Sequence, residues 1–107
     1  MKKIIDGKIY DTENAEEIAS FSFSRHGACD YLKEILYVAD DRKIFIYGEG
    51  GAISKYTTVD DNGEFHGSST IHAFCIGEMI EWFDAYSDYI ELKDGAVNDF
   101  INKNKPA

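Results

Sequence analysis

Residues 32–56, which read LKEILYVADDRKIFIYGEGGAISKY, decide the fold. Two apolar runs, residues 35–38 and 44–47, lie on either side of a short polar connection that contains two aspartates. β-Branched and aromatic residues around such a connection are typical of a β-hairpin. Both runs are apolar on both faces, which predicts central strands that are covered on two sides.

A glycine block, residues 48–52 (GEGGA), follows the second run. Three glycines in four positions are expected to permit backbone angles that other residues avoid. A phosphate-binding loop is disfavoured because the Lys-Ser/Thr pair of a P-loop is missing, no helix pattern follows, and Glu49 would repel an anion. We therefore interpret the block as a tight connection to a further strand at residues 53–59.

Composition predicts one globular domain, residues 1–107, because 44% of the residues are hydrophobic and 14% are aromatic. The net charge is −9, from 11 basic and 20 acidic residues, which favours basic partners over nucleic acid or membrane surfaces. Solubility alone is an equally good explanation of this acidity. Without a long apolar run or a signal peptide, a cytoplasmic protein is expected.

The N-terminal segment predicts a small hairpin over residues 2–10, because Asp6-Gly7 separates two apolar runs. The hairpin carries three of the candidate contact residues, Lys2, Lys3 and Lys8. A helix cap near Thr12, acidic residues after it and a thin apolar stripe predict a short helix over residues 13–20. Residues 21–29 are interpreted as a connection with two aromatic anchors.

The C-terminal half begins with an Asn-Gly turn at residues 60–63, followed by a strand over residues 64–75 that is interrupted near residues 67–69. A helix is predicted over residues 76–88, with an inward stripe of Ile76, Met79, Ile80 and Phe83. The opposite side gathers four acidic residues, Glu78, Glu81, Asp84 and Asp88, and Trp82 and Tyr86 lie at its border. This side is either a solvated helix surface or a docking face for a basic groove with aromatic anchors.

A last short helix is predicted from residue 94. The fold class is thus α+β, with an N-terminal hairpin and short helix, a central antiparallel β-meander and C-terminal helices.

Candidate chemistry is sparse. His26 with Cys29 and His72 with Cys75 could supply a zinc set, but residues three apart on a strand point to opposite faces, so packed thiols are favoured over a metal site. No carboxylate pair or Cys–His nucleophile is singled out by its surroundings. The residues therefore predict a binding module without metal, cofactor, small-molecule substrate or catalytic group.

Two stretches resemble a known family. Residues 5–15, IDGKIYDTENA, are similar to the "NGK-x-Y-(D/N)-T-E-x-A" opening of small proteins encoded by phages, plasmids and other mobile elements of Gram-positive bacteria. Residues 47–56, YGEGGAISKY, are similar to the "YGEGGA-x-SKY" block of the same family. Together they span residues 5–56, about half of the chain, in the family's order and spacing. The C-terminal half departs from the family, because residues 71–78 read IHAFCIGE where members often carry a Gly- and Trp-containing turn and a "PL-(T/S)-x-E-E-A" helix start.

Several members of this family are anti-CRISPR proteins, which inhibit the RNA-guided nuclease of type II CRISPR systems through the guide RNA or its loading. The resemblance implies that nuclease, its guide RNA, or both as partner, and the cytoplasm of a bacterial host as location. The alternatives are a ribonuclease-like protein that uses His26 or His66, an inducer of guide truncation, and a mobile-element accessory protein with another partner. The candidate partner-binding residues are Lys2, Lys3, Lys8, Glu49, Lys55, Tyr56, Glu78, Glu81, Trp82, Asp84 and Asp88.

Overall fold

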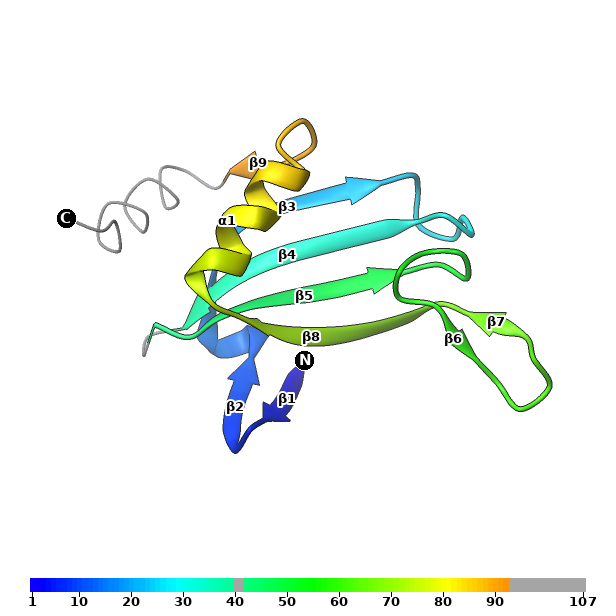
Figure 1. Cartoon of the computed structure of the whole chain (residues 1–107), viewed down its shortest axis with the longest axis horizontal. Helices are drawn as coiled ribbons and strands as arrows, with labels where there is room; N and C mark the ends of the chain where they lie inside the picture. Colours follow the sequence, from blue (N-terminus) through cyan, green and yellow to red (C-terminus); the bar gives the residue numbers. More distant parts are fainter. Residues whose placement is uncertain (40–41, 93–107) are drawn as a thin grey trace.

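A five-stranded antiparallel sheet with one helix across it forms the body of the protein (Figure 1). The computed structural model describes residues 1–39 and 42–92, apart from the side chain of Leu92. The spatial order of the strands is β8-β5-β4-β3-β9. Their bounds are β3 Ala15–Phe23, β4 Leu32–Ala39, β5 Ile44–Gly50, β8 Ser68–Phe74 and β9 Glu91–Leu92. The α+β class and the central meander are confirmed, and the helix predicted from residue 94 lies outside the described residues.

The central hairpin is the pairing of β4 with β5, in which Leu36 lies opposite Ile46 and Tyr37 opposite Phe45. One face packs under the helix in a cluster that includes Leu36 and Ile46, and the other face holds a second cluster around Phe45. Phe45 is fully buried between the ring of Tyr10, at 5.6 Å, and that of Tyr37, at 5.3 Å. The central strands are therefore covered on both sides, as their unbroken apolar pattern predicts.

The N-terminal hairpin is confirmed as β1 (Lys2–Ile5) and β2 (Lys8–Asp11). Asp6 and Gly7 both have positive φ, 51° and 78°, which is the backbone of the type I′ turn that the Asp-Gly pair predicts. Its Tyr10 side chain enters the second core cluster. The second small hairpin, β6 (Thr58–Val59) with β7 (Phe65–His66), closes through the predicted turn at residues 60–63.

The helix predicted over residues 13–20 is wrong. The cap exists, because the Asp11 side chain accepts a hydrogen bond from the Glu13 amide, but it starts only a single 3-10 turn, η1 (Thr12–Asn14). The chain then extends as β3, which pairs with β4 and buries Ile18 and Phe21. An isolated helix this short is marginal, whereas pairing along β4 offers a full ladder of hydrogen bonds and apolar burial.

The strand predicted over residues 53–59 is also mostly wrong, because only Thr58–Val59 is strand. Turns occupy residues 52–56 and carry Tyr56 back over the sheet, where only 5% of its surface stays exposed. The strand predicted over residues 64–75 is confirmed as β7 and β8, with its interruption at Gly67.

The main helix, α1 (Ile76–Ala85), begins at the predicted residue and ends three residues early. Its inward side differs from the predicted stripe. Met79 and Trp82 are 3% and 4% exposed, whereas Ile80 is 59% exposed. The helix is rotated because Trp82 carries the largest apolar surface and its indole N–H meets an acceptor in the sheet.

Within residues 1–39 and 42–92, no helix combines the length and apolar character that crossing a bilayer requires.

The sheet core yields the first prediction. Leu36→Ala removes a fully buried side chain and should lower the free energy of unfolding by about 2–5 kcal/mol. Ile53→Ala, at a side chain that is 71% exposed, is the control and should change it by less than about 0.5 kcal/mol. Urea denaturation followed by Trp82 fluorescence measures both, and equal effects of the two substitutions would contradict this core.

Candidate functional site

The glycine block packs against the chain on both sides. A Cβ on Gly48 would overlap the Tyr56 ring, one on Gly50 would overlap Ser54, and one on Gly51 would overlap the carbonyls of Ala28 and Cys29. None of the three has a positive φ. The expectation of unusual backbone angles is therefore wrong, and close approach is the reason for glycine at these positions.

Glu34 is the buried partner of this block. It lies opposite Gly48 in the β4–β5 register and is 2% exposed. The Trp82 indole donates to one carboxylate oxygen at 3.1 Å, and the Tyr56 hydroxyl donates to the other, which also pairs with the Lys55 ammonium at 2.9 Å. The carboxylate thus joins the sheet to the helix and to the loop after β5.

The pKa values around Glu34 reflect this environment. Burial, followed by the hydrogen bond to Glu34, raises the pKa of Tyr56 well above its ordinary value. Burial acts to lower the pKa of Lys55, but the Glu34 carboxylate outweighs it and the net shift is upward. Tyr56 and Lys55 therefore keep their protons, and the pair with Glu34 persists through the neutral range.

Three predicted contact residues thus have structural roles. Tyr56 and Trp82 are buried, so the prediction that Trp82 is an aromatic anchor on the surface is wrong. Lys55 is half exposed, but its ammonium is held by Glu34 and the Tyr86 hydroxyl. All three side chains donate to Glu34, because a buried carboxylate is stable only when it is paired and hydrogen-bonded.

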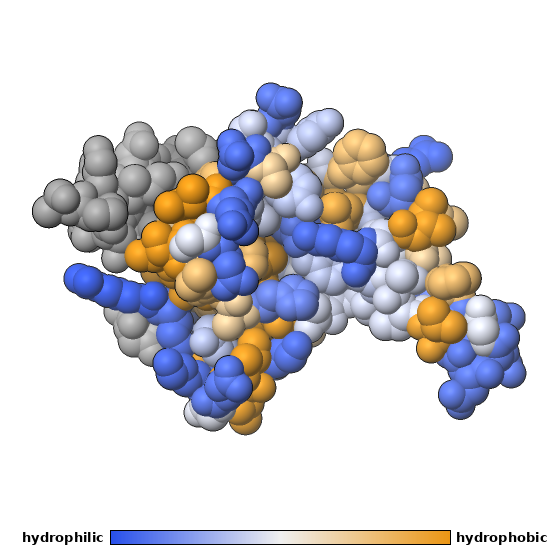
Figure 2. Space-filling view, in the orientation of Figure 1, coloured by the Kyte–Doolittle hydropathy of each residue, from blue (hydrophilic) through white to orange (hydrophobic). Residues whose placement is uncertain are grey.

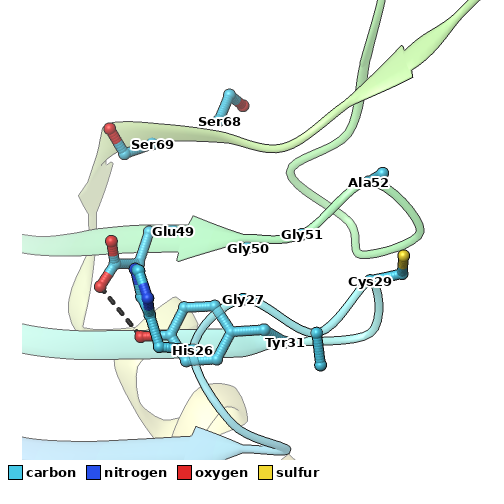
Figure 3. Close-up of a pocket in the computed structure, with 11 residues that line it drawn as sticks. His26, Gly27, Cys29, Tyr31, Glu49, Gly50, Gly51, Ala52, Ser68 and Ser69 are labelled. Atoms are coloured by element: carbon cyan, nitrogen blue, oxygen red, sulfur yellow. Dashed lines mark hydrogen bonds between the residues drawn. The ribbon is translucent and has the colours of Figure 1, made fainter.

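A pocket of about 410 Å³ lies beside the glycine block and contains Glu49 (Figure 3). Successive strand residues point to opposite faces, so Glu49 projects away from Glu34 and α1. The Tyr31 hydroxyl donates to one Glu49 carboxylate oxygen at 3.0 Å, and the Tyr47 hydroxyl lies 3.4 Å from the other. The His26 ring meets Tyr31 edge-on at 5.2 Å. The pocket therefore combines a held carboxylate with two aromatic rings.

Burial and the hydrogen bond to Glu49 raise the pKa of Tyr31 to about 12. Burial also raises the pKa of Tyr47. Both phenols are hydrogen-bond donors at neutral pH, not bases. Within the described part of the chain, no hydrogen bond joins Cys29 or a serine of the pocket to a histidine, so no activated nucleophile is formed there.

The two His-x-x-Cys pairs lie at opposite ends of the sheet. The Cys29 carbonyl bonds the Ile53 amide beside the glycine block, whereas Cys75 caps α1 after the far end of β8. A different group, Asp60, Glu64 and His66, places its ligand atoms within 4.8 Å of one another on the β6–β7 hairpin. The Asp60 carboxylate there accepts hydrogen bonds from the backbone amides of Asn62 and Glu64, as is usual in an Asx turn.

The other predicted residues lie at the surface. Lys2 and Lys8 are exposed, whereas the Lys3 ammonium bonds Thr70 and the Ile71 carbonyl and fastens the hairpin to β8. The acidic residues of α1 and the turn after it are exposed, namely Glu78, Glu81, Asp84 and Asp88. Glu78 also completes the capping box with Cys75, and this lowers the pKa of its carboxyl.

Sequence reasoning missed Glu34, Tyr31 and Tyr47, and it considered His26 only as a metal ligand or a ribonuclease residue. A signal for Glu34 existed, because a charged residue within an otherwise apolar strand needs a buried partner. No such signal existed for His26 or Tyr31, which reach the pocket through the loop between β3 and β4.

Gly48→Ala should destabilise the protein by about 1–3 kcal/mol, because the new methyl group displaces Tyr56 from Glu34. Gly77→Ala is the matched control, since a Cβ there meets only the Cys75 sulfur at 3.8 Å and alanine favours a helix. Thermal unfolding measures both. A Gly48→Ala protein as stable as Gly77→Ala would contradict the packing described.

Alkaline pH should destabilise the fold. The folded pKa of Tyr31, about 12, exceeds the ordinary value of 10.0, so the unfolded chain loses this proton first. The contribution of Tyr31 is complete below pH 10 and is lost as the pH rises towards 12. Unfolding measured against pH should therefore show a smaller alkaline loss in Tyr31→Phe than in Tyr89→Phe, whose ring is exposed. Identical slopes would contradict the Tyr31–Glu49 bond.

No protein-family model matches the chain, and neither a curated protein nor a solved structure matches it. What the site does has therefore to be inferred from its own residues.

Proposed function

We propose that the protein is a non-catalytic inhibitor that binds a type II RNA-guided CRISPR nuclease and interferes with loading or integrity of its guide RNA. The motifs at residues 5–15 and 47–56 suggest the target. The observation that carries the proposal is the exposed acidic side of α1 in a protein of net charge −9. Nucleases of this type hold guide and target in a positively charged channel, which attracts such a surface.

The surface of α1 suits protein contact for a second reason. Ile76 and Ile80 are 39% and 59% exposed beside the acidic residues. Figure 2 shows apolar and hydrophilic side chains side by side over this helix. These isoleucines take the place of Trp82 as the apolar part of the interface, because apolar contact adds affinity where charges add orientation and association rate.

The N-terminal hairpin supports a secondary contact with RNA. Lys2 and Lys8 are exposed on it and carry positive charge in an otherwise acidic protein. Lys3 is occupied by Thr70 and Ile71, so it orients the hairpin and does not reach a phosphate.

A ribonuclease is the second candidate, and one observation favours it. The His66 imidazole lies 2.8 Å from the Asp60 carboxylate on the β6–β7 hairpin, which is the arrangement of an oriented general base. The His66 side chain is exposed and that of Asp60 is partly exposed, and Asp60 is already explained by its turn. Inhibition without cleavage is therefore the better reading.

The test is an order-of-addition cleavage assay with a type II nuclease, in which the guide RNA is run on a gel beside the DNA product. Inhibition that requires addition before the guide, with intact RNA, supports competition for the guide channel. Guide shortened by the protein alone, and lost in His66→Ala, would replace inhibition by a ribonuclease activity. No inhibition in either order, across several nucleases, would overturn the proposal.

A charge-reversal variant locates the surface. Glu81→Lys, Asp84→Lys and Asp88→Lys together should raise the half-inhibitory concentration about tenfold or more, because the charges that face the channel are reversed. Glu78 is left intact because it caps the helix. Glu13→Lys, Glu16→Lys and Glu64→Lys make the same change in net charge elsewhere on the surface and form the matched control. Equal losses in both variants would mean that only overall charge matters.

A further inference from the structure

The Glu49 carboxylate has only neutral donors. A carboxylate offers about four lone-pair sites, and the tyrosine hydroxyls of residues 31 and 47 occupy one on each oxygen. Among the residues described, no lysine, arginine or histidine forms an ion pair with Glu49. Its side chain is only partly exposed, so water screens the charge less than it would on an open surface.

Two lysines of the described part of the chain, Lys33 and Lys55, do not form an ion pair with Glu49. Lys33 lies opposite Glu49 in the β4–β5 register, yet no ion pair joins them. Its side chain lines a different pocket, with Ser22 and Glu91. Lys55 is held by Glu34 on the other face of the sheet. As far as the described residues go, the pocket therefore presents a carboxylate that forms no ion pair within the chain.

The remaining walls define the shape and chemistry of a ligand. Tyr31 and His26 place their rings beside the carboxylate, and Ser69 of β8 belongs to the opposite wall (Figure 3). Ser69 lies opposite Glu49 in the β5–β8 register and therefore on the same face, whereas Ser68 donates a hydrogen bond to the Tyr56 carbonyl on the face of Glu34. Aromatic rings and a carboxylate together suit a flat cation with several N–H groups.

We propose that this pocket binds the guanidinium group of an arginine side chain. The two free lone-pair sites, one on each oxygen of Glu49, match the fork of N–H donors that guanidinium presents. The group is planar and weakly hydrated, so it stacks on a tyrosine or histidine ring at less cost than an ammonium. A bare metal ion fits poorly, because two phenol O–H groups already donate to the carboxylate, and among the described residues no set of three metal-ligating atoms converges at Glu49.

This site is separate from the acidic side of α1, because Glu49 and the helix lie on opposite faces of the sheet. It also requires no assumption about the target, since any protein with an accessible arginine could supply the group. Failure of the nuclease inhibition assay would therefore leave the pocket's ligand chemistry intact, and failure of the pocket would leave inhibition through α1 intact.

The test is titration of the whole chain with N-acetyl-arginine methylamide, followed by amide chemical shifts. The neutral citrulline analogue, which has nearly the same shape, is the ligand control. Saturable shifts at Tyr31, Glu49 and Gly51 are expected with arginine and not with citrulline. Glu49→Gln should weaken the arginine effect about tenfold or more, since a charged hydrogen-bonded pair is lost. Glu13→Gln, at an exposed carboxylate before β3 and away from the pocket, should leave it unchanged.

Equal shifts with citrulline and arginine in the unmodified protein would overturn the proposal, whether or not the variants fold. So would equal weakening by the two substitutions, because the attraction would then be a property of the acidic surface as a whole. Shifts confined to residues of α1 would also overturn it, since they would place the cation on the opposite face. A shift at the pocket that Glu49→Gln leaves unaltered would show that the carboxylate is not the ligand.

Discussion

The buried carboxylate of Glu34 is the interaction on which the arrangement of the other elements depends. An ionised group removed from water is strongly unfavourable unless it is paired and hydrogen-bonded. Here the Trp82 indole of α1 and the Tyr56 hydroxyl and Lys55 ammonium of the loop after β5 supply the donors. Placing α1 and the loop after β5 correctly is thus the condition for burying Glu34.

The glycine block meets this condition by providing space. The ring of Tyr56 can lie over β5 only because residue 48 has no side chain. Ser54, in the turn that leads to Tyr56, packs against Gly50, and the loop between β3 and β4 packs against Gly51. The alternation of a strand then gives Glu49 the opposite direction. One short block therefore closes the core on one face and presents an acidic pocket on the other. A binding site built this way is held by the same packing that stabilises the fold.

The negative charge that a partner can reach therefore lies in two different settings, on α1 and at Glu49. On α1 it is a row of exposed carboxylates, whose attraction for a basic surface weakens as salt screens it. At Glu49 it is a single, partly enclosed group between aromatic rings, where geometry selects the partner. A row of exposed charges contributes mainly to the rate of association, and an enclosed charge contributes to specificity. The two surfaces lie on opposite faces of one sheet, so each can act without the other.

Local sequence alone was enough to specify four features: the central hairpin, the type I′ turn at Asp6-Gly7, the turn at residues 60–63 and the start of α1. Turn chemistry, strand propensity and helix capping each depend on residues that are close together in the chain. Local sequence did not determine the state of residues 15–23, where a cap and a thin apolar stripe predicted a helix up to residue 20 and a connection after it. Their pairing with β4 is non-local and outweighs that preference. Nor did it determine which side of α1 faces inward. That side is set by Trp82, whose indole N–H donates a hydrogen bond to the buried Glu34 carboxylate of the sheet. The Glu49 pocket likewise exists only in the folded chain, since His26 and Tyr31 reach it from a different loop.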